Sequence, residues 1–446
     1  MKQKLIVISV LFVLMAASAE GQNVRLSVAG AVQQGLKNNP EIQNAALGKQ
    51  KSQSEHVGLK SKLYPQIQAY SDFSYSYALP KMIVPGELFG QGGDIPVVFG
   101  TKYNWNSGFK ATQLLYNQSY FTALRVAGLQ TGLEQLNLQQ KNENLVYQIT
   151  QLYYLCQTTR QQREHLSVTA GNMSHLLQIT GLLHQNELIR KIDHDQVLVD
   201  QNNLQREIDN LDQLFEQQLN LMKFLIGIEA EASIELTDSL AFSVREVATL
   251  MPSWENRTEM KMLNSQFEMA SLSLKQGKQE YLPVLSGYAQ YYYQGQRDRF
   301  DFFDGGDNRF FNVGGVGLSL SIPVFDGFER REKIQQRKLT MQQLRNRQMQ
   351  TVNYLTKEHV NASLQYDNNR KAVVRQKENI GIAEKNYRIA LLGYEQQTIS
   401  LTDLLRAQNS LTESRLTYAN ALLQFKNAEL DLIRSKGGLL IEYINQ

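Results

Sequence analysis

The chain has 446 residues, 42% of them hydrophobic, a single cysteine and a formal net charge of +3. So small a charge argues against a nucleic-acid-binding protein and against a polybasic membrane-binding patch. The one cysteine, Cys156, excludes an intramolecular disulfide.

Residues 1–21 have the pattern of a secretory signal peptide. Lys2 and Lys4 give a basic start, Leu5–Leu14 is an apolar run, and cleavage is expected after Ala19 or Gly21. No later segment has 18 consecutive apolar residues, so the sequence predicts no membrane-spanning helix. Two classes remain, a soluble exported protein and a membrane β-barrel.

Residues 22–226 are predicted to form a first structural repeat. Two helices, Ser27–Asn39 and one from Pro40 to about Lys62, come first. Residues 66–77 then alternate between apolar and polar, which predicts a strand, and residues 103–115 alternate in the same way. The two strands are joined by a loop rich in Pro and Gly, Ala78–Thr101.

A helical hairpin is predicted to end this repeat. One helix runs to about His184 and the next from Asp193 to about Phe224. Residues 227–252 show only short, irregular patterns, and we interpret them as a connecting equatorial segment.

Residues 253–446 are predicted to form a second repeat. A helix, Trp254–Tyr281, leads to strands at residues 284–293 and 311–322. The loop between these strands, Gln294–Arg309, is rich in Gly, Asp and Phe. A long helical hairpin, Gly327–Lys436, and a C-terminal segment follow.

The second hairpin carries a seven-residue repeat typical of a coiled-coil seam. Its first helix has about 65 residues without Pro and would be roughly 100 Å long. So long a hairpin indicates a strut rather than the wall of an enzyme pocket. The repeated positions are Val352, His359, Tyr366, Val373, Ile380, Tyr387 and Tyr394, and then Leu404, Leu411, Tyr418, Phe425 and Leu432.

Corresponding residues of the two halves are separated by a nearly constant number of positions, which indicates a duplication. The separation is 218 for Glu41 with Glu259 and for Pro65 with Pro283, and 210 for Asp193 with Asp403. It shortens within the loop between the paired strands, where insertions are tolerated.

Four strands cannot close a barrel, and open strand edges are not tolerated in lipid. Three copies would give twelve strands, within the known range of outer-membrane barrels. A soluble sheet packed beside a helical bundle is the alternative, but the strands carry much Gly, Ser and Gln for a dry core. They are also rich in aromatic residues, as membrane-interface girdles are: Tyr70, Tyr75, Tyr77, Trp105, Tyr288, Tyr291 and Tyr292.

The chain resembles TolC-type outer-membrane efflux proteins over essentially its whole mature length. The matching stretches are GLKNNPEIQNA at residues 35–45, LYPQIQAYSDFSYSY at 63–77, LSIPVFDGFERREKI at 320–334 and GYEQQTISLTDLLRAQNSLTESRLTYANALLQF at 393–425. The resemblance implies a mainly α fold with a membrane β-barrel. It implies a homotrimer whose twelve-stranded barrel continues into a periplasmic α-helical barrel. It further implies a passive duct that works with a periplasmic adaptor and an inner-membrane transporter.

The resemblance also implies a gate at the closed, periplasmic end. It places Tyr394 and Asp193 as a link between the two hairpins, and Asp403 in a ring of aspartates around the axis. Two residues depart from the family pattern: Ile399 replaces a gate-linking arginine, and Arg406 replaces a second ring of aspartates. Arg406 would weaken the cation preference. The alternative is that Asp403 only caps its helix.

The two hairpin turns, Gln185–Ile192 and Gln396–Leu401, are polar and end long helices. We expect them to form the periplasmic end and to receive the adaptor. The expected contact residues are Glu187, Leu188, Ile189, Thr398, Ile399 and Ser400.

Three other patterns are weak candidates for binding sites. The run Gly314–Gly317 lies inside a strand pattern with no helix after it, so small residues in a crowded strand explain it better than nucleotide binding. Calcium binding by Asp301, Asp304 and Asp307 lacks the bidentate Glu of a standard loop. The polar groups His184, Asp193, His194 and Asp195 at the first turn are typical of a solvated helix end.

No enzyme motif is found, and the sequence predicts no cofactor, no metal and no catalytic residue. A barrel-anchored trimeric coiled-coil adhesin is the alternative to an export duct. Adhesins of that kind usually place their strands once, at one end, whereas here strand pairs occur twice between helices. The sequence leaves open what is exported and which pump is served.

Overall fold

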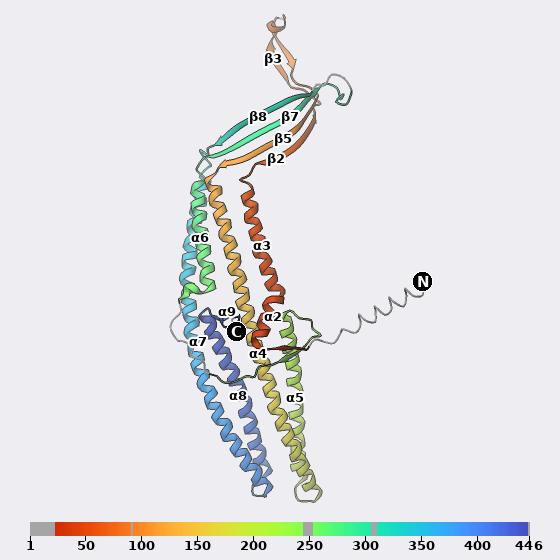
Figure 1. Cartoon of the computed structure of the whole chain (residues 1–446), viewed down its shortest axis with the longest axis vertical. Helices are drawn as coiled ribbons and strands as arrows, with labels where there is room; N and C mark the ends of the chain where they lie inside the picture. The colour runs from red at the N-terminus through yellow and green to blue at the C-terminus, as the bar shows by residue number, and fades with distance from the viewer. Residues whose placement is uncertain (1–22, 91, 244–252, 305–309, 445–446) are drawn as a thin grey trace, which may run out of the picture. The chain divides into compact units, whose positions relative to one another are not determined.

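The protein is described by a computed structural model for residues 23–90, 92–243, 253–304 and 310–444 (Figure 1). The predicted signal peptide lies outside these residues. The chain forms two compact units, one of residues 1–49, 134–264 and 346–446 and one of residues 50–133 and 265–345. Helices α4 (Gln118–Gln185) and α7 (Glu329–Glu395) contribute residues to both units.

The second unit contains a four-stranded antiparallel sheet in the order β2-β5-β7-β8 (Figure 1). Its strands are β2 (Gln66–Tyr75), β5 (Tyr103–Tyr116), β7 (Val284–Arg297) and β8 (Phe310–Ser321). All four strands predicted from alternation are therefore confirmed. β7 continues to Arg297, four residues beyond the predicted end, because it remains paired with β5 up to Tyr103.

The loop predicted at Ala78–Thr101 is wrong in part, because it contains a second hairpin. β3 (Lys81–Pro85) and β4 (Asp94–Val98) pair antiparallel, with the short 3-10 helix η2 (Gly86–Phe89) between them. Pro96 argued against a strand, since proline cannot donate to a ladder. In a two-stranded sheet both strands are edges, so the missing N–H of Pro96 can face away from the partner strand.

Helices make up most of the first unit, and in the second unit helices lead into and out of the strands of the sheet. The remaining helices are α2 (Val28–Asn38), α3 (Pro40–Ser61), α5 (Lys191–Ile226), the 3-10 helix η3 (Trp254–Asn256), α6 (Thr258–Gln279), α8 (Leu401–Ser435) and α9 (Leu439–Ile444). Each half of the chain thus runs helix, strand, strand, long helix, long helix. Among the described residues, no helix is both long enough and apolar enough to cross a membrane.

The predicted seven-residue seam of the second hairpin is confirmed by packing between α7 and α8. Tyr366, Val373, Phe425 and Leu432 belong to one buried cluster. The rings of Tyr366 and Phe425 lie 5.3 Å apart between centroids. His359 is also buried, and its Nδ1 lies 2.9 Å from the Ser435 hydroxyl, which satisfies a polar group inside the seam.

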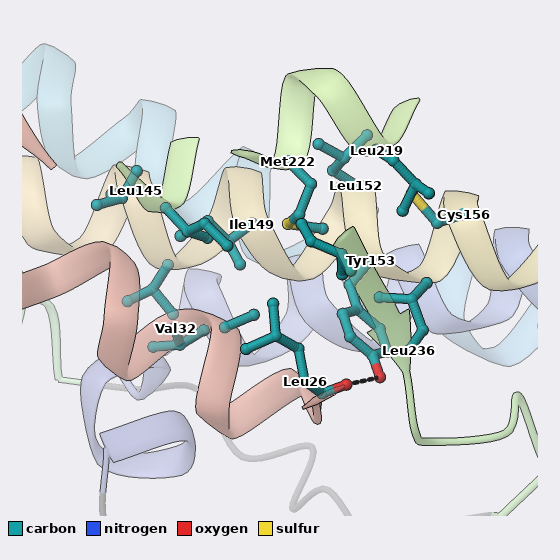
Figure 2. Packing of buried hydrophobic residues seen from close by; sticks show 14 of the residues in the cluster. Leu26, Val32, Leu145, Ile149, Leu152, Tyr153, Cys156, Leu219, Met222 and Leu236 are labelled. Atoms are coloured by element: carbon teal, nitrogen blue, oxygen red, sulfur yellow. Dashed lines mark hydrogen bonds between the residues drawn. The ribbon is translucent and has the colours of Figure 1, made fainter. Parts of the chain in front are cut away.

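The largest buried cluster joins α4, α5 and α2 to a small parallel sheet (Figure 2). That sheet pairs β1 (Asn23–Leu26) with β6 (Ser233–Leu236), so the segment predicted as irregular contains a strand. The hydroxyl of the fully buried Tyr153 donates to the Leu26 carbonyl at 2.8 Å (Figure 2). The N-terminal strand is therefore tied to the helical core.

Candidate functional site

The two hairpin turns share one backbone design. Glu187 and Gln397 both adopt the left-handed conformation, with φ of 60° and 61°. One residue later, the Leu188 amide donates to the Leu183 carbonyl and the Thr398 amide to the Gly393 carbonyl, both at 2.8 Å. This is the Schellman end of a helix, in which glycine is the usual left-handed residue. The turns are defined structures rather than loose connections.

The helices that follow the two turns begin differently. Ser400 caps α8: its hydroxyl accepts from the Asp403 amide at 3.2 Å and donates to Asp403 Oδ2 at 2.7 Å. Arg190 stands at the same place before α5 and makes no side-chain cap. Its guanidinium instead donates to Asp193, with Nε at 3.0 Å from Oδ2 and Nη2 at 2.8 Å from Oδ1. These bonds hold the pKa of Asp193 below its usual value.

A cavity of about 380 Å³ lies between the two turns, and it contains the predicted gate residues Asp193 and Tyr394. Burial, and then the nearby Asp193 carboxylate, raises the pKa of Tyr394. The described part of the chain shows no hydrogen bond from the Tyr394 hydroxyl to Asp193. Arg190, which sequence reasoning did not select, binds that carboxylate instead; its only sequence signal was an Arg three residues before an Asp.

Asp403 and Arg406 are close but weakly paired. Arg406 Nη1 lies 3.6 Å from Asp403 Oδ1, and both side chains are exposed. Ile399, in the place of a family arginine, packs on the preceding helix: a β-carbon at Gly393 would lie 2.6 Å from Ile399 Cδ1. The second turn therefore closes by an apolar contact. A ring of Asp403 residues requires several copies, so it stays a prediction.

Among the expected adaptor contacts, Glu187, Leu188, Thr398 and Ser400 are exposed, whereas Ile189 and Ile399 are half-buried and line the cavity between the turns. Leu188 has 66% of its surface exposed. The turns thus combine polar edges with accessible apolar groups.

The candidate metal positions do not form a cluster in the described residues, where no group of three or more His, Cys, Asp or Glu could hold an ion. His184 and His194 stack with ring centroids 6.2 Å apart, and His194 Nδ1 lies 3.2 Å from the Thr180 hydroxyl. Asp301 pairs with Arg297 at 3.0 Å. Asp304 is exposed, and its backbone amide donates to the Asp301 carbonyl at 3.4 Å. Asp307, the third candidate for calcium, lies outside the described residues.

The four-stranded sheet has one apolar and one polar face. In the strand register, Ile67, Phe109 and Leu318 lie on the same face, and 60% or more of the surface of each is exposed. The other apolar-face residues include Ala69, Phe73, Tyr75, Trp105, Ala111, Leu285, Ala289, Tyr291, Tyr293, Val316 and Leu320. The polar face carries Gln66, Gln68, Tyr70, Asp72, Asn104, Asn106, Lys110, Thr112, Tyr288, Gln290, Tyr292, Gln294, Ser319 and Ser321.

An aromatic cluster lies on the apolar face at the end of the sheet where β7 leads into the Phe-rich loop. The ring centroid of Trp105 is 6.3 Å from that of Phe73, 5.5 Å from that of Phe302 and 6.0 Å from that of Phe310. Tyr75 and Tyr103 add a pair at 4.8 Å. Aromatic side chains at the margin of an exposed apolar band are typical of a membrane interface.

Both outer edges of this sheet, β2 and β8, lack a partner strand within the described residues of the chain. An exposed edge is a template for pairing with another chain. Within the described residues, both edges of the sheet are therefore open to pairing with another strand.

Comparison with known proteins supports the resemblance for the second half of the chain. Residues 253–438 match the model of the family described as "Outer membrane efflux protein". The resemblance seen in the sequence is therefore confirmed. No curated protein matches the chain.

Solved structures of outer membrane proteins and channels have the same fold over both halves. The outer membrane protein VceC of Vibrio cholerae is 15% identical with a TM-score of 0.76, over 92% of this chain and 96% of that one. The CmeC outer membrane channel of Campylobacter jejuni is 15% identical with a TM-score of 0.77, over 92% of this chain and 85% of that one. The MtrE outer membrane channel of Neisseria gonorrhoeae, in its open state, is 15% identical with a TM-score of 0.74, over 92% of this chain and 89% of that one.

Proposed function

We propose that three copies of this chain form a passive export duct in the outer membrane of a Gram-negative bacterium. The observation that carries the proposal is the four-stranded sheet with one exposed apolar face, one polar face and two open edges. In a sheet of this kind, the apolar face suits contact with lipid and the polar face suits a water-filled lumen. The family match of residues 253–438 and the fold of the efflux channels support the same function.

The direction of the strands supports closure by several copies. Along the sheet the strands alternate in direction, so β8 of one copy would run antiparallel to β2 of the next. Each copy adds an even number of strands, as outer-membrane barrels require. The strands have 10 to 14 residues, against about 9–11 needed to cross a bilayer at a tilt. Three copies give the twelve strands of the proposed barrel.

The proposal assigns the hairpin turns to the periplasmic end, where they would contact an adaptor that connects the duct to an inner-membrane transporter. The resemblance to efflux proteins motivates the partners. The exposed Leu188 beside polar Glu187, and Thr398 beside Ser400, offer the mixed surface that a transient protein contact needs. In this arrangement the loops Ala78–Thr101 and Gln294–Arg309 face the outside of the cell.

Disulfide trapping across the open edges tests the proposal. Gln68→Cys on β2 is combined in turn with Gly315→Cys or Ser319→Cys on β8. Within one chain these strands are separated by β5 and β7, about 14 Å at the usual strand spacing. A disulfide needs Cα atoms within ~7 Å, so only neighbouring copies can form the bond.

Oxidation in the membrane should give linked species of two and three chains and nothing larger. The native Cys156 is buried and will not compete. Each single-cysteine variant is the control and should stay a single chain on a denaturing gel. Intramolecular linkage, or a ladder that extends beyond three chains, would contradict the closed trimer.

A further inference from the structure

The glycine run of β8 has a specific contact on the polar face of the sheet. Gly317 lies opposite Tyr288 of β7. A β-carbon at Gly317 would lie 2.5 Å from Tyr288 Cζ and 2.5 Å from its Oη. The phenol ring therefore lies flat across the glycine, in the space that any other side chain would occupy.

Gly315, two residues away on the same face, has no such neighbour. A β-carbon there would meet nothing within 4 Å. Neither glycine has a positive φ, so the backbone at both positions is open to alanine. The requirement for glycine at residue 317 is therefore the ring of Tyr288 and not the backbone.

A second tyrosine pair on this face also spans a glycine. Tyr70, Gly108 and Tyr292 form one row across three strands, and the two ring centroids are 6.3 Å apart. A β-carbon at Gly108 would collide with the backbone of β7 itself. Aromatic rings across strand glycines stabilise sheets in general, but here both cases occur on the face proposed to line the lumen.

The charges of the polar face cancel within each copy. In the four described strands, Asp72 and Lys110 are the only charged residues on that face, and most of the others are amides, hydroxyls, glycines and phenols. The register also places four apolar residues there: Leu114, Val284, Phe311 and Val313. A wall of this composition offers little selection by charge. Its selection would depend on how far the largest side chains extend into the lumen.

We propose that Gly317 sets the width of the duct by letting Tyr288 lie flat against its wall. The inference rests on the proposed function, because it requires the polar face to line the lumen. Alanine at residue 317 displaces the ring from the wall, and in three copies the displaced rings narrow one level of the barrel. With glycine at residue 317 the lumen stays wide at this level, so the duct admits bulky cargo of either charge. Selection at this level is by size.

The test measures passage through the barrel from outside the cell. Ser321→Cys lies on the polar face, beyond Gly317 as seen from the loops, and provides a thiol target. Maleimide reagents of graded size are added to intact cells, and the rate of modification is measured. The test is made in three backgrounds: the native strand, Gly317→Ala, and the matched control Gly315→Ala.

We expect the largest reagents that modify Ser321→Cys in the native strand to lose access in Gly317→Ala, while the smallest maleimide still reacts. Gly315→Ala should leave the whole size profile unchanged. Adding Tyr288→Ser to Gly317→Ala should restore access, because the ring that blocks the lumen is then absent. Equal size profiles in the native, Gly317→Ala and Gly315→Ala backgrounds would overturn the proposal.

Two further outcomes are separated by design. If Gly317→Ala does not assemble, the double variant Gly317→Ala with Tyr288→Ser is measured instead. It should assemble, because the three atoms nearest to the added β-carbon all belong to the Tyr288 phenol. Failure of the double variant as well would overturn the proposal. If the smallest maleimide modifies a cysteine at Leu320 on the apolar face but not one at Ser321, the polar face is not the lumen and the proposed function itself fails.

Discussion

Arg190 and Asp193 form a two-point ion pair within a single hairpin turn, with N–O distances of 3.0 and 2.8 Å. The predicted gate link, from Asp193 to Tyr394 of the other hairpin, therefore competes with a partner three residues away. Asp193 and Tyr394 nevertheless line the same cavity. In this chain, the contact between hairpins depends on how Arg190 holds the carboxylate.

The first prediction is that Asp193→Ala combined with Tyr394→Phe loosens the closed end of the duct. The carboxylate and the hydroxyl of the predicted link between the hairpins are then both removed, so the closed-state conductance in planar bilayers should rise. Arg190→Ala tests the competing contact and should lower the closed-state conductance, because the Asp193 carboxylate is then free to accept from the Tyr394 hydroxyl. Unchanged closed-state conductance in both variants would leave these residues as ordinary polar groups at a helix end.

The same ion pair should respond to acid. The folded pKa of Asp193 is below its ordinary value, which is about 3.9 for aspartate. A lowered pKa gives a contribution that is complete above the ordinary value and is lost as the pH falls through the folded value. The pair is therefore intact between about pH 5 and 8, and it should give the conductance no dependence on pH in that range. Acidification below about pH 4 should reproduce the effect of Asp193→Ala. A change centred near pH 6 would point to another group.

The second prediction concerns the charge at the axis. Asp403→Ala should lower the preference for cations, and Arg406→Ala should raise it, because Arg406 Nη1 lies 3.6 Å from the Asp403 carboxylate. Reversal potentials measured across a salt gradient report both changes. Shifts of the same sign, or none, would mean that the pair only stabilises the start of α8.

The third prediction concerns the outer loops. A peptide tag inserted at Gly92, between β3 and β4, should bind antibody on intact cells. A β-carbon at Gly92 meets nothing within 4 Å, so the position tolerates an insertion. The same tag placed at Gln185 is the matched control and should be detected only after the outer membrane is opened. Surface detection at Gln185 would reverse the proposed orientation.

The fourth prediction is that photo-reactive groups at Glu187 or Thr398 capture the periplasmic adaptor. Both side chains are exposed at the turns. The control position is Gly58, also at an open helical site but in the unit that contains the sheet. Capture at Gly58 and not at the turns would contradict the proposed adaptor surface.

The sequence was sufficient for the long helices and for the four strands of the main sheet, because their apolar periods are sustained. The β3–β4 hairpin was missed, since Pro85 and Pro96 argue against strands. β1 and β6 were missed because each has four residues and its partner lies about 210 positions away. Within the site, the sequence indicated Asp193 and Tyr394 but not Arg190, whose role depends on the geometry of one turn. The flat Tyr288 ring likewise depends on the strand register.

In the proposed trimer, the open sheet of one chain is completed by two further copies. Native mass spectrometry of the protein extracted from outer membranes in mild detergent tests it most directly. The account predicts a species with three times the mass of the mature chain, which heating converts to single chains. A monomer under the same conditions would contradict the account, because its exposed apolar face and two open strand edges would then have no partner.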